Sequence, residues 1–276
     1  MKFDAARTPG LNAFMKRALA LLPVLALLAP APATASALTG QHAVYSFTLT
    51  KLRTHDITGA TGAMTFDVVD GCTGWATTQH MTIIIRGVDG SLNKTVSDYM
   101  TWETKDGKTL TFTSRESDND GAEQIDDAGS ATHKPDGSGM VTYTTPASTQ
   151  YTLPPGTLFP MQHTEALLAA GDQGQNFIAP LLFDGTDSTG AQATFVAVLK
   201  HRGAEKTAWP ALDAIPSTDV DIAFFARKSD DENPDFRSAM RYFENGVADN
   251  LVLDFGDFVM TGKLIRLTIP PSPCPK

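Results

Sequence analysis

The chain has 276 residues, with 22 lysine and arginine against 31 aspartate and glutamate residues and a net charge of −9 at neutral pH. This acidic balance argues against nucleic acids and anionic lipid headgroups as partners, because like charges repel. The length allows one large β domain or two small domains.

The first 37 residues are typical of a secretory signal peptide. Four cations precede an apolar stretch of about twelve residues (Ala18–Ala29), and small residues offer cleavage after Ala35 or Ala37. The stretch is short for a membrane span and contains Pro23. We therefore expect export and a mature chain of residues 38–276, with an uncleaved anchor as the alternative.

After Leu38 the first half of the chain alternates between apolar and polar residues, which is typical of β-strands. Asp-Gly pairs separate the runs and suit tight turns that need positive φ. The expected turns lie at Asp70-Gly71, Asp89-Gly90, Asp106-Gly107 and Asp136-Gly137. The expected strands are His42–Leu52, Gly62–Asp70, Trp75–Arg86, Lys94–Thr104, Lys108–Glu116 and Gly139–Pro146.

A helix interrupts the strands in the middle of the chain. The segment 160–174 reads PMQHTEALLAAGDQG, which predicts a short amphipathic helix that begins at Pro160 or Thr164 and ends at Gly171 or Gly174. Strands then resume, and Asn245-Gly246 is a strong hairpin signal. The expected strands of this half are Ala193–Arg202, Asp219–Lys228, Phe236–Glu244 and Asn250–Ile269.

The two cysteines, Cys72 and Cys274, lie near opposite ends of the mature chain. In an oxidising compartment such a pair is expected to form a disulfide, with two buried free thiols as the alternative. The bond would close a loop of about 200 residues and stabilise the fold by about 5 kcal/mol in the chain-entropy model. It would also anchor the proline-rich tail 270–275. Because it joins the two halves, it favours one continuous sheet over two domains, although two domains stay possible.

Candidate catalytic residues are few. His163 and Glu165 could perform acid–base chemistry, but Glu165 also suits the first turn of a helix. Asp219 and Asp221 share a strand face, where a solvent-facing pair is a simpler interpretation than a glycosidase pair. Ser117–Gly121 lacks the acidic positions that a calcium loop needs.

The six histidines show no spacing typical of a metal site. Trp75, Trp102 and Trp209, with the fifteen phenylalanines, are expected mainly in the core. An apolar groove for a lipid or peptide is the alternative use of these aromatic residues.

Four segments together resemble the EipB family of envelope-integrity proteins from the Gram-negative periplasm. They are DGCTGW (70–75), LFPMQHTEALLAA with IAPLLFDG (158–185), RYFENGVADNLVLDFGDF (241–258) and PPSPC (270–274). The resemblance implies a β-spiral, which is a strongly curved, open-barrel-like antiparallel sheet with one packed helix, similar to lipoprotein-carrier folds. It also implies a disulfide between Cys72 and Cys274.

The resemblance implies a periplasmic role in envelope integrity with a TPR-containing protein as partner, and it supplies no catalytic residues. We therefore expect a non-enzymatic scaffold or protein-binding module without cofactor or metal. The first alternative is a lipid or lipoprotein carrier that binds acyl chains in an apolar cavity. The second is an envelope-polymer hydrolase, which would have to use His163 with Glu165 or Asp219 with Asp221.

Overall fold

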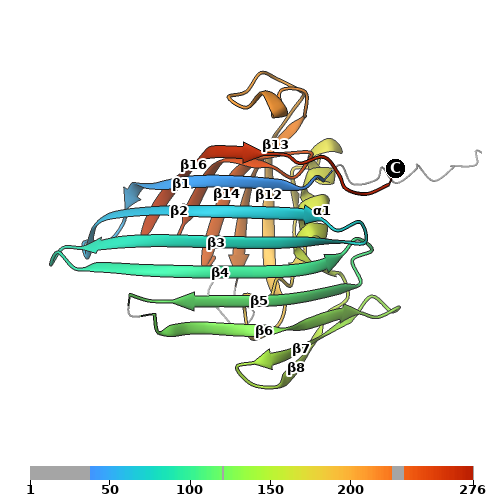
Figure 1. The fold of residues 1–276 in the computed structure, drawn as a ribbon, viewed down its shortest axis with the longest axis horizontal. Helices are drawn as coiled ribbons and strands as arrows, with labels where there is room; N and C mark the ends of the chain where they lie inside the picture. The colour runs from blue at the N-terminus through green and yellow to red at the C-terminus, as the bar shows by residue number, and fades with distance from the viewer. Residues whose placement is uncertain (1–37, 120, 226–232, 276) are drawn as a thin grey trace, which may run out of the picture. The chain divides into compact units, whose positions relative to one another are not determined.

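The computed structural model describes residues 38–119, 121–225 and 233–275. The predicted signal peptide, residues 1–37, lies outside the described residues. The first half of the described chain is an antiparallel succession of eight strands (Figure 1). They are β1 (Gln41–Leu52), β2 (Ile57–Asp70), β3 (Gly74–Gly87), β4 (Leu92–Thr104), β5 (Thr109–Ser117), β6 (Glu123–His133), β7 (Gly139–Thr145) and β8 (Thr149–Leu153).

The second half returns to pair with the first strand. Its elements are β9 (Thr157–Leu158), α1 (Pro160–Asp172), β10 (Phe177–Ile178), β11 (Leu181–Leu182), β12 (Gln192–Arg202), the 3-10 turn η1 (Pro210–Leu212), β13 (Ser217–Phe225), β14 (Phe236–Phe243), β15 (Ala248–Asp254) and β16 (Phe258–Thr268). Strand β16 pairs with β1, so the described strands form one sheet in the order β8 to β1, then β16 to β11 and β9. All pairs are antiparallel except β9 with β11.

The sheet curls until its two ends meet through side chains. Phe112 of β5 and Tyr143 of β7 pack against Phe183, which follows β11, and all three rings lie in one buried cluster. The Tyr143 hydroxyl donates to the carbonyl of Asp187 at 2.6 Å. These contacts confirm the expected fold class, a strongly curved, mainly β sheet with one packed helix.

Alternation along each strand decides which side chains face the interior. On β1, Ala43, Tyr45 and Phe47 are buried while the residues between them are partly exposed, as the sequence pattern predicts. Charged residues usually face solvent. The strands β4 and β6 depart from this rule, because their buried residues include Glu103 and Asp127. Carboxylates therefore enter an otherwise apolar interior.

Helix α1 lies across one end of the curved sheet (Figure 1) and contacts β12 and β13. It begins at Pro160, where the missing amide hydrogen of proline has no cost. Its residues Leu167 and Leu168 are buried against Val196 and Val220. A Cβ at Gly171 would lie 2.3 Å from Oγ1 of Thr218, so only glycine permits this close approach of helix and sheet.

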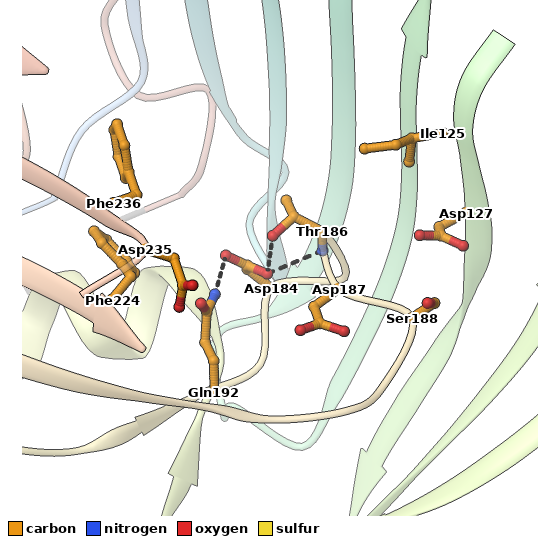
Figure 2. Close-up of a pocket in the computed structure, with 10 residues that line it drawn as sticks. All are labelled: Ile125, Asp127, Asp184, Thr186, Asp187, Ser188, Gln192, Phe224, Asp235 and Phe236. Atoms are coloured by element: carbon orange, nitrogen blue, oxygen red, sulfur yellow. Dashed lines mark hydrogen bonds between the residues drawn. The ribbon is translucent and has the colours of Figure 1, made fainter. Parts of the chain in front are cut away.

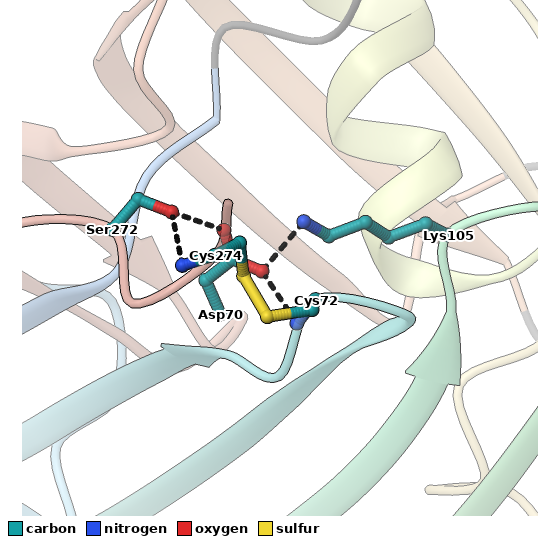
Figure 3. Close-up of a disulfide and its surroundings, with 5 residues drawn as sticks. All are labelled: Asp70, Cys72, Lys105, Ser272 and Cys274. Atoms are coloured by element: carbon teal, nitrogen blue, oxygen red, sulfur yellow. Dashed lines mark hydrogen bonds and ion pairs between the residues drawn. A yellow bond between two sulfur atoms is a disulfide. The ribbon is translucent and has the colours of Figure 1, made fainter. Parts of the chain in front are cut away.

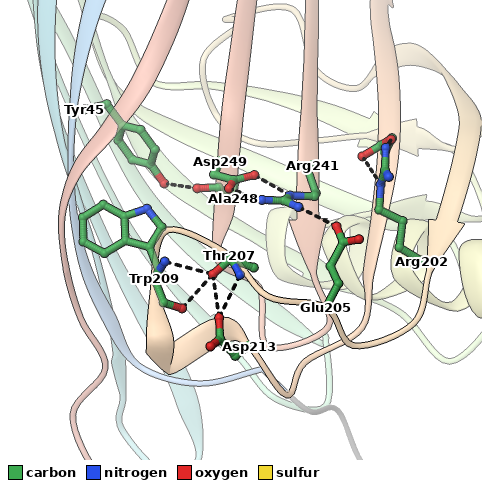
Figure 4. Close-up of polar contacts among 10 residues, drawn as sticks. Tyr45, Arg202, Glu205, Thr207, Trp209, Asp213, Arg241, Ala248 and Asp249 are labelled. Carbon is green, nitrogen blue, oxygen red and sulfur yellow. Dashed lines mark hydrogen bonds and ion pairs between the residues drawn. The ribbon is translucent and has the colours of Figure 1, made fainter.

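The loop 203–216 folds back on β14 and β15 (Figure 4). Leu212 of η1 is fully buried in the same cluster as Phe243. Arg241 holds the loop through Glu205 at 3.0 Å and also forms a two-point ion pair with Asp249. The loop is therefore a packed part of the fold.

Three expectations about local structure need correction. The run Asn250–Ile269, expected as one strand, is divided between the paired strands β15 and β16. The strands β6 and β8 were not predicted. The sequence of β6 contains few β-branched or aromatic residues, and β8 is only five residues long. The turn at Asp70-Gly71 places its positive φ at Cys72, with φ 67°, rather than at the glycine. Gly71 is needed for space, since a Cβ there would lie 2.5 Å from the Trp102 ring.

Among the described residues, no helix combines the length and the apolar character needed to cross a membrane. The strand prediction 219–228 runs past the end of β13, and its last three residues lie outside the described part of the chain.

Candidate functional site

Three adjoining cavities lie within the curved sheet. The methionine chamber has a volume of about 270 Å³, the helix cavity about 310 Å³ and the acidic cavity about 550 Å³. Met240 and Tyr242 line both the methionine chamber and the helix cavity, while Phe236 lines both the methionine chamber and the acidic cavity. Because neighbouring cavities share wall residues, we treat the interior as one candidate binding site.

The methionine chamber is formed by inward-facing residues of β1 to β3, β14 and β15. Methionine is flexible and polarisable, so a wall of this kind adapts to apolar groups of different shape. Phenylalanine rings complete the wall, and the volume of the chamber lies just below the range of about 300–1,000 Å³ that is usual for small-molecule sites. Its apolar wall includes Met64, Met81, Met240, Phe66, Phe236 and Phe255.

The helix cavity lies below the N-terminus of α1, which Glu103 caps. The Glu103 carboxylate accepts hydrogen bonds from the backbone amides of Met161 at 2.7 Å and Gln162 at 3.1 Å. These amides have no partner within the helix, so the carboxylate satisfies them. Burial raises the pKa of Glu103 to about 7. Glu103 thus positions the helix over the cavity.

His163 and Glu165 do not form an acid–base pair in this structure. His163 is buried at the wall of the helix cavity, and its Nε2 lies 3.2 Å from Oγ1 of Thr194. Burial lowers the pKa of His163 to about 4, so the ring is neutral at pH 7. Glu165 does not line this cavity. The geometry favours a structural role for His163. The expected place of Glu165 in the first turn of the helix is wrong, because α1 begins at Pro160 and its first turn contains no acidic residue.

Asp219 and Asp221 each pair with an arginine on the outer face of the sheet. Asp219 binds Arg202 at 2.5 Å and Asp221 binds Arg237 at 2.6 Å. Both carboxylates are therefore held in cross-strand ion pairs and do not line any of the three cavities. The solvent-face interpretation fits this geometry.

The segment Ser117–Gly121 begins at the last residue of β5 and leads toward β6. Asn119 accepts a hydrogen bond from the backbone amide of Lys94 and donates one to the carbonyl of Leu92. Its amide thus ties this connection to the start of β4.

The acidic cavity is lined by four aspartates from three segments (Figure 2). Asp127 comes from β6, Asp184 and Asp187 from the β11–β12 connection, and Asp235 precedes β14. Asp184 accepts hydrogen bonds from Thr186 at 2.7 Å and from the Gln192 amide at 3.2 Å. Asp184 also lines the helix cavity, so it lies where the two spaces adjoin.

The structure joins Cys72 to Cys274 across 202 residues of sequence, with the two Cα atoms 5.3 Å apart (Figure 3). The expected disulfide is therefore present. Asp70 supports the bond: it accepts hydrogen bonds from the Cys72 amide at 2.9 Å and the Ser272 hydroxyl at 3.2 Å. Lys105 pairs with the same carboxylate at 2.5 Å and lowers the pKa of Asp70. The proline-rich tail is thus held on the β2–β3 turn.

The three tryptophans serve the framework rather than a groove. Trp75 is buried in a core cluster and carries the Lys105 ammonium 4.3 Å above its ring. Trp102 is 37% exposed, so it does not lie in the core as expected; it packs over Gly74, next to the disulfide turn. Trp209 packs against the cluster that contains Leu212. None of them lines the three cavities.

One surface cluster could in principle ligate a cation. Asp172, His201 and Glu244 place one ligand atom each within 4.8 Å of one another. No pattern in the sequence indicated this cluster, because its three residues come from separate segments of the chain. Exposed acidic groups commonly gather in this way without an ion, so we assign no metal to it.

The sequence did not identify the residues that give the interior its chemistry. Glu103 appears in the sequence as an ordinary strand residue, and Asp127 lies in β6, which the sequence did not predict. Only alternation along a correctly placed strand turns them inward. Asp184, Asp187 and Asp235 lie in connections, where acidic residues are common. The methionines of the chamber are far apart in sequence.

Comparisons with known proteins agree with this architecture. The model of the EipB-like family matches residues 32–271. A protein of Brucella abortus (strain 2308) named cell envelope integrity protein EipB is 27% identical over 248 residues, which cover 87% of this chain and 88% of that protein.

The crystal structure of a β-barrel-like protein of a domain of unknown function, also from Brucella abortus, matches with a TM-score of 0.76 and 27% identity. The match covers 85% of this chain and 99% of that one. Because the family model spans most of the sequence and the solved relative shares the fold, this chain belongs to the EipB-like family.

Proposed function

We propose that this chain is a non-enzymatic protein of the periplasm that maintains cell-envelope integrity by binding another envelope component. The name of the Brucella abortus relative supports the envelope role. The disulfide between Cys72 and Cys274 supports an oxidising compartment outside the cytoplasm. The pairing of Asp219 and Asp221 with arginines and the burial of His163 argue against the hydrolase alternative.

The methionine chamber is the observation that carries the binding role. A scaffold that used only its outer surface would need no interior space, whereas this chamber offers about 270 Å³ behind a wall of methionine and phenylalanine. The occupant with matching chemistry is an acyl chain, which makes the lipid or lipoprotein carrier the form of binding that the geometry favours. A TPR-containing partner would then receive or present the cargo.

Binding of an apolar fluorophore tests this proposal. N-phenylnaphthylamine brightens in an apolar site, and we expect saturable brightening with the disulfide-bonded protein and displacement by fatty acyl groups. Met240→Trp should abolish it, because Met240 lines both the methionine chamber and the helix cavity. Met81→Trp tests the other side of the chamber.

The matched control is Met100→Trp, since Met100 lies on the outer face of β4 with 46% exposure. It should bind the fluorophore like the natural protein. Thermal melting of each variant separates loss of the chamber from loss of the fold. A well-folded natural protein that fails to brighten the fluorophore would rule out acyl-chain binding.

The envelope role has its own test. Deletion of the gene should sensitise cells to a membrane-active detergent, and expression of the natural chain should restore resistance. Met100→Trp should restore it as well, whereas Met240→Trp should not. Full rescue by a chamber-filled variant would show that the envelope role does not depend on the interior.

A further inference from the structure

We propose that the acidic cavity binds the cationic head of an amphiphile whose apolar tail occupies the methionine chamber. The ligand class is thus an ammonium or guanidinium group attached to an apolar chain. This inference rests on the proposed function, because it adds the charge of the ligand to the acyl-chain binding proposed above.

Asp127 gives the strongest indication of a cationic ligand. The residue is only 6% exposed and lines the acidic cavity from the inner face of β6 (Figure 2). Among the described residues, no hydrogen-bond donor or cation pairs with its carboxylate. The charges that affect it are the carboxylates of Asp187 and Asp126. A buried carboxylate of this kind is costly unless a partner neutralises it, and a ligand cation would be that partner.

The other ionisable side chains described in the wall of the acidic cavity are also acidic. Asp184 and Asp187 also line it, and among its described wall residues there is no lysine, arginine or histidine. Burial raises the pKa of Asp184, and Asp187 raises it further. Burial likewise raises the pKa of Asp127, again with a contribution from Asp187. A ligand cation would relieve this repulsion, whereas an anionic head would increase it.

The spacing of the carboxylates favours an organic cation over a metal ion. In the described part of the chain, no three acidic groups of this cavity bring ligand atoms within 4.8 Å of one another. A group that carries several N–H donors can reach carboxylates that are too far apart for one metal ion. Phe224 and Phe236 also line the cavity, and aromatic faces attract organic cations.

The acidic cavity adjoins both apolar cavities. Phe236 borders both the acidic cavity and the methionine chamber. Asp184, Thr186 and Phe224 border both the acidic cavity and the helix cavity. A charged head in the acidic cavity would therefore lie next to the apolar walls against which its tail would pack.

Titration calorimetry with four simple probes tests this inference on the disulfide-bonded protein. The probes are decylammonium, decanoate, decanol and butylammonium, each below the concentration at which it aggregates. We expect decylammonium to bind at least about tenfold more tightly than decanoate, because opposite charges attract and like charges repel. Added salt should narrow this difference. Butylammonium, which lacks the tail, should bind weakly.

Substitution of single carboxylates assigns the effect to the cavity. Asp127→Asn should reduce the difference between decylammonium and decanoate to less than about threefold, without changing the affinity for decanol. Glu123→Gln is the matched control, since Glu123 is an exposed carboxylate at the start of β6 and does not line the acidic cavity. It should leave the preference unchanged. Asp187→Asn is a second variant in case Asp127→Asn does not fold.

Two results would overturn the inference of a cationic head but would leave the proposed acyl-chain binding intact. In the first, decanol binds but decylammonium binds no more tightly than decanoate. In the second, Asp127→Asn and Asp187→Asn, both folded, keep the full preference. Failure of all probes that carry a tail would overturn the proposed acyl-chain binding as well, so the two failures can be told apart.

Discussion

Glu103 is only 1% exposed, yet its carboxylate is the cap for the N-terminus of α1. Burial raises its pKa from 4.5 to about 7, so the folded protein holds this proton more tightly than the unfolded chain does. The contribution of this group to stability is therefore fully present below pH 4.5 and is lost as the pH rises through about 7.

Glu103→Gln should remove this pH dependence. Between pH 4.5 and pH 8, the free energy of unfolding of the natural protein should fall relative to that of the variant by on the order of 3 kcal/mol. Urea unfolding at several pH values measures this difference. Glu123→Gln, at an exposed position, is the control. Parallel curves for the natural protein and Glu103→Gln would contradict the assignment.

Two ion pairs between aspartate and arginine differ in how deeply they are buried. Asp249 with Arg241 and Asp221 with Arg237 are both two-point pairs between neighbouring strands. The side chains of the first pair are 10% and 15% exposed, and those of the second are 26% and 50% exposed. Loss of one partner should therefore leave a costly unpaired charge only in the first pair.

We expect Asp249→Ala to lower the free energy of unfolding by about 3 kcal/mol, since Arg241 would stay buried and lose its main partner. Asp221→Ala should cost less than about 1 kcal/mol, because solvent screens the exposed pair. Denaturant unfolding of both variants provides the comparison. Equal losses would show that burial does not set the strength of these pairs.

At the scale of elements, the C-terminal tail and the β2–β3 turn depend on each other. The tail beyond β16 contains several prolines and forms no strand of its own, so the disulfide and the Asp70 contacts hold it. Gly71 and Gly74 leave room for the Trp102 ring beside this turn. The disulfide thus fixes the tail to the β2–β3 turn, and Trp102 of β4 packs beside this turn.

Cys72→Ser and Cys274→Ser should each lower the free energy of unfolding by about 2–5 kcal/mol and make the protein more sensitive to protease. Ser272→Ala, which removes only the hydrogen bond to Asp70, should cost about 1 kcal/mol. Thermal melting and limited proteolysis measure both effects. If the two serine variants melt like the oxidised parent, the disulfide is not a structural tie.

At the scale of the whole molecule, every described strand belongs to one sheet that begins and ends near the same buried cluster. Connections between the two halves of the chain include the pairing of β1 with β16, the packing of Phe183 on Phe112, and the disulfide. Neither half could bury its inner face without the other.

We therefore expect one cooperative unfolding transition. Tryptophan fluorescence, which reports on Trp75, Trp102 and Trp209, should follow the same urea curve as far-ultraviolet circular dichroism, which reports on the whole sheet. Two separated transitions would instead support the two-domain alternative. The measurement should be repeated with the disulfide reduced, where loss of coincidence would show that the disulfide is needed for cooperative unfolding.

The sequence by itself determined the class of the fold and much of its outline. Alternation placed Tyr45 and Phe47 inside, Pro160 marked the start of the helix, and Asn245-Gly246 marked a hairpin, because each depends on interactions between residues that are neighbours along the chain. The pairing of Cys72 with Cys274 needed only the compartment and the absence of other cysteines.

Only the tertiary structure decided what the interior can bind. The strand β6 has low intrinsic β-propensity and is held by its neighbours, so Asp127 could not be placed inside from the sequence. Asp184, Asp187 and the chamber methionines meet because the sheet curls back on itself. Such contacts between distant segments have no local signature, whereas strands, turns and helix ends do.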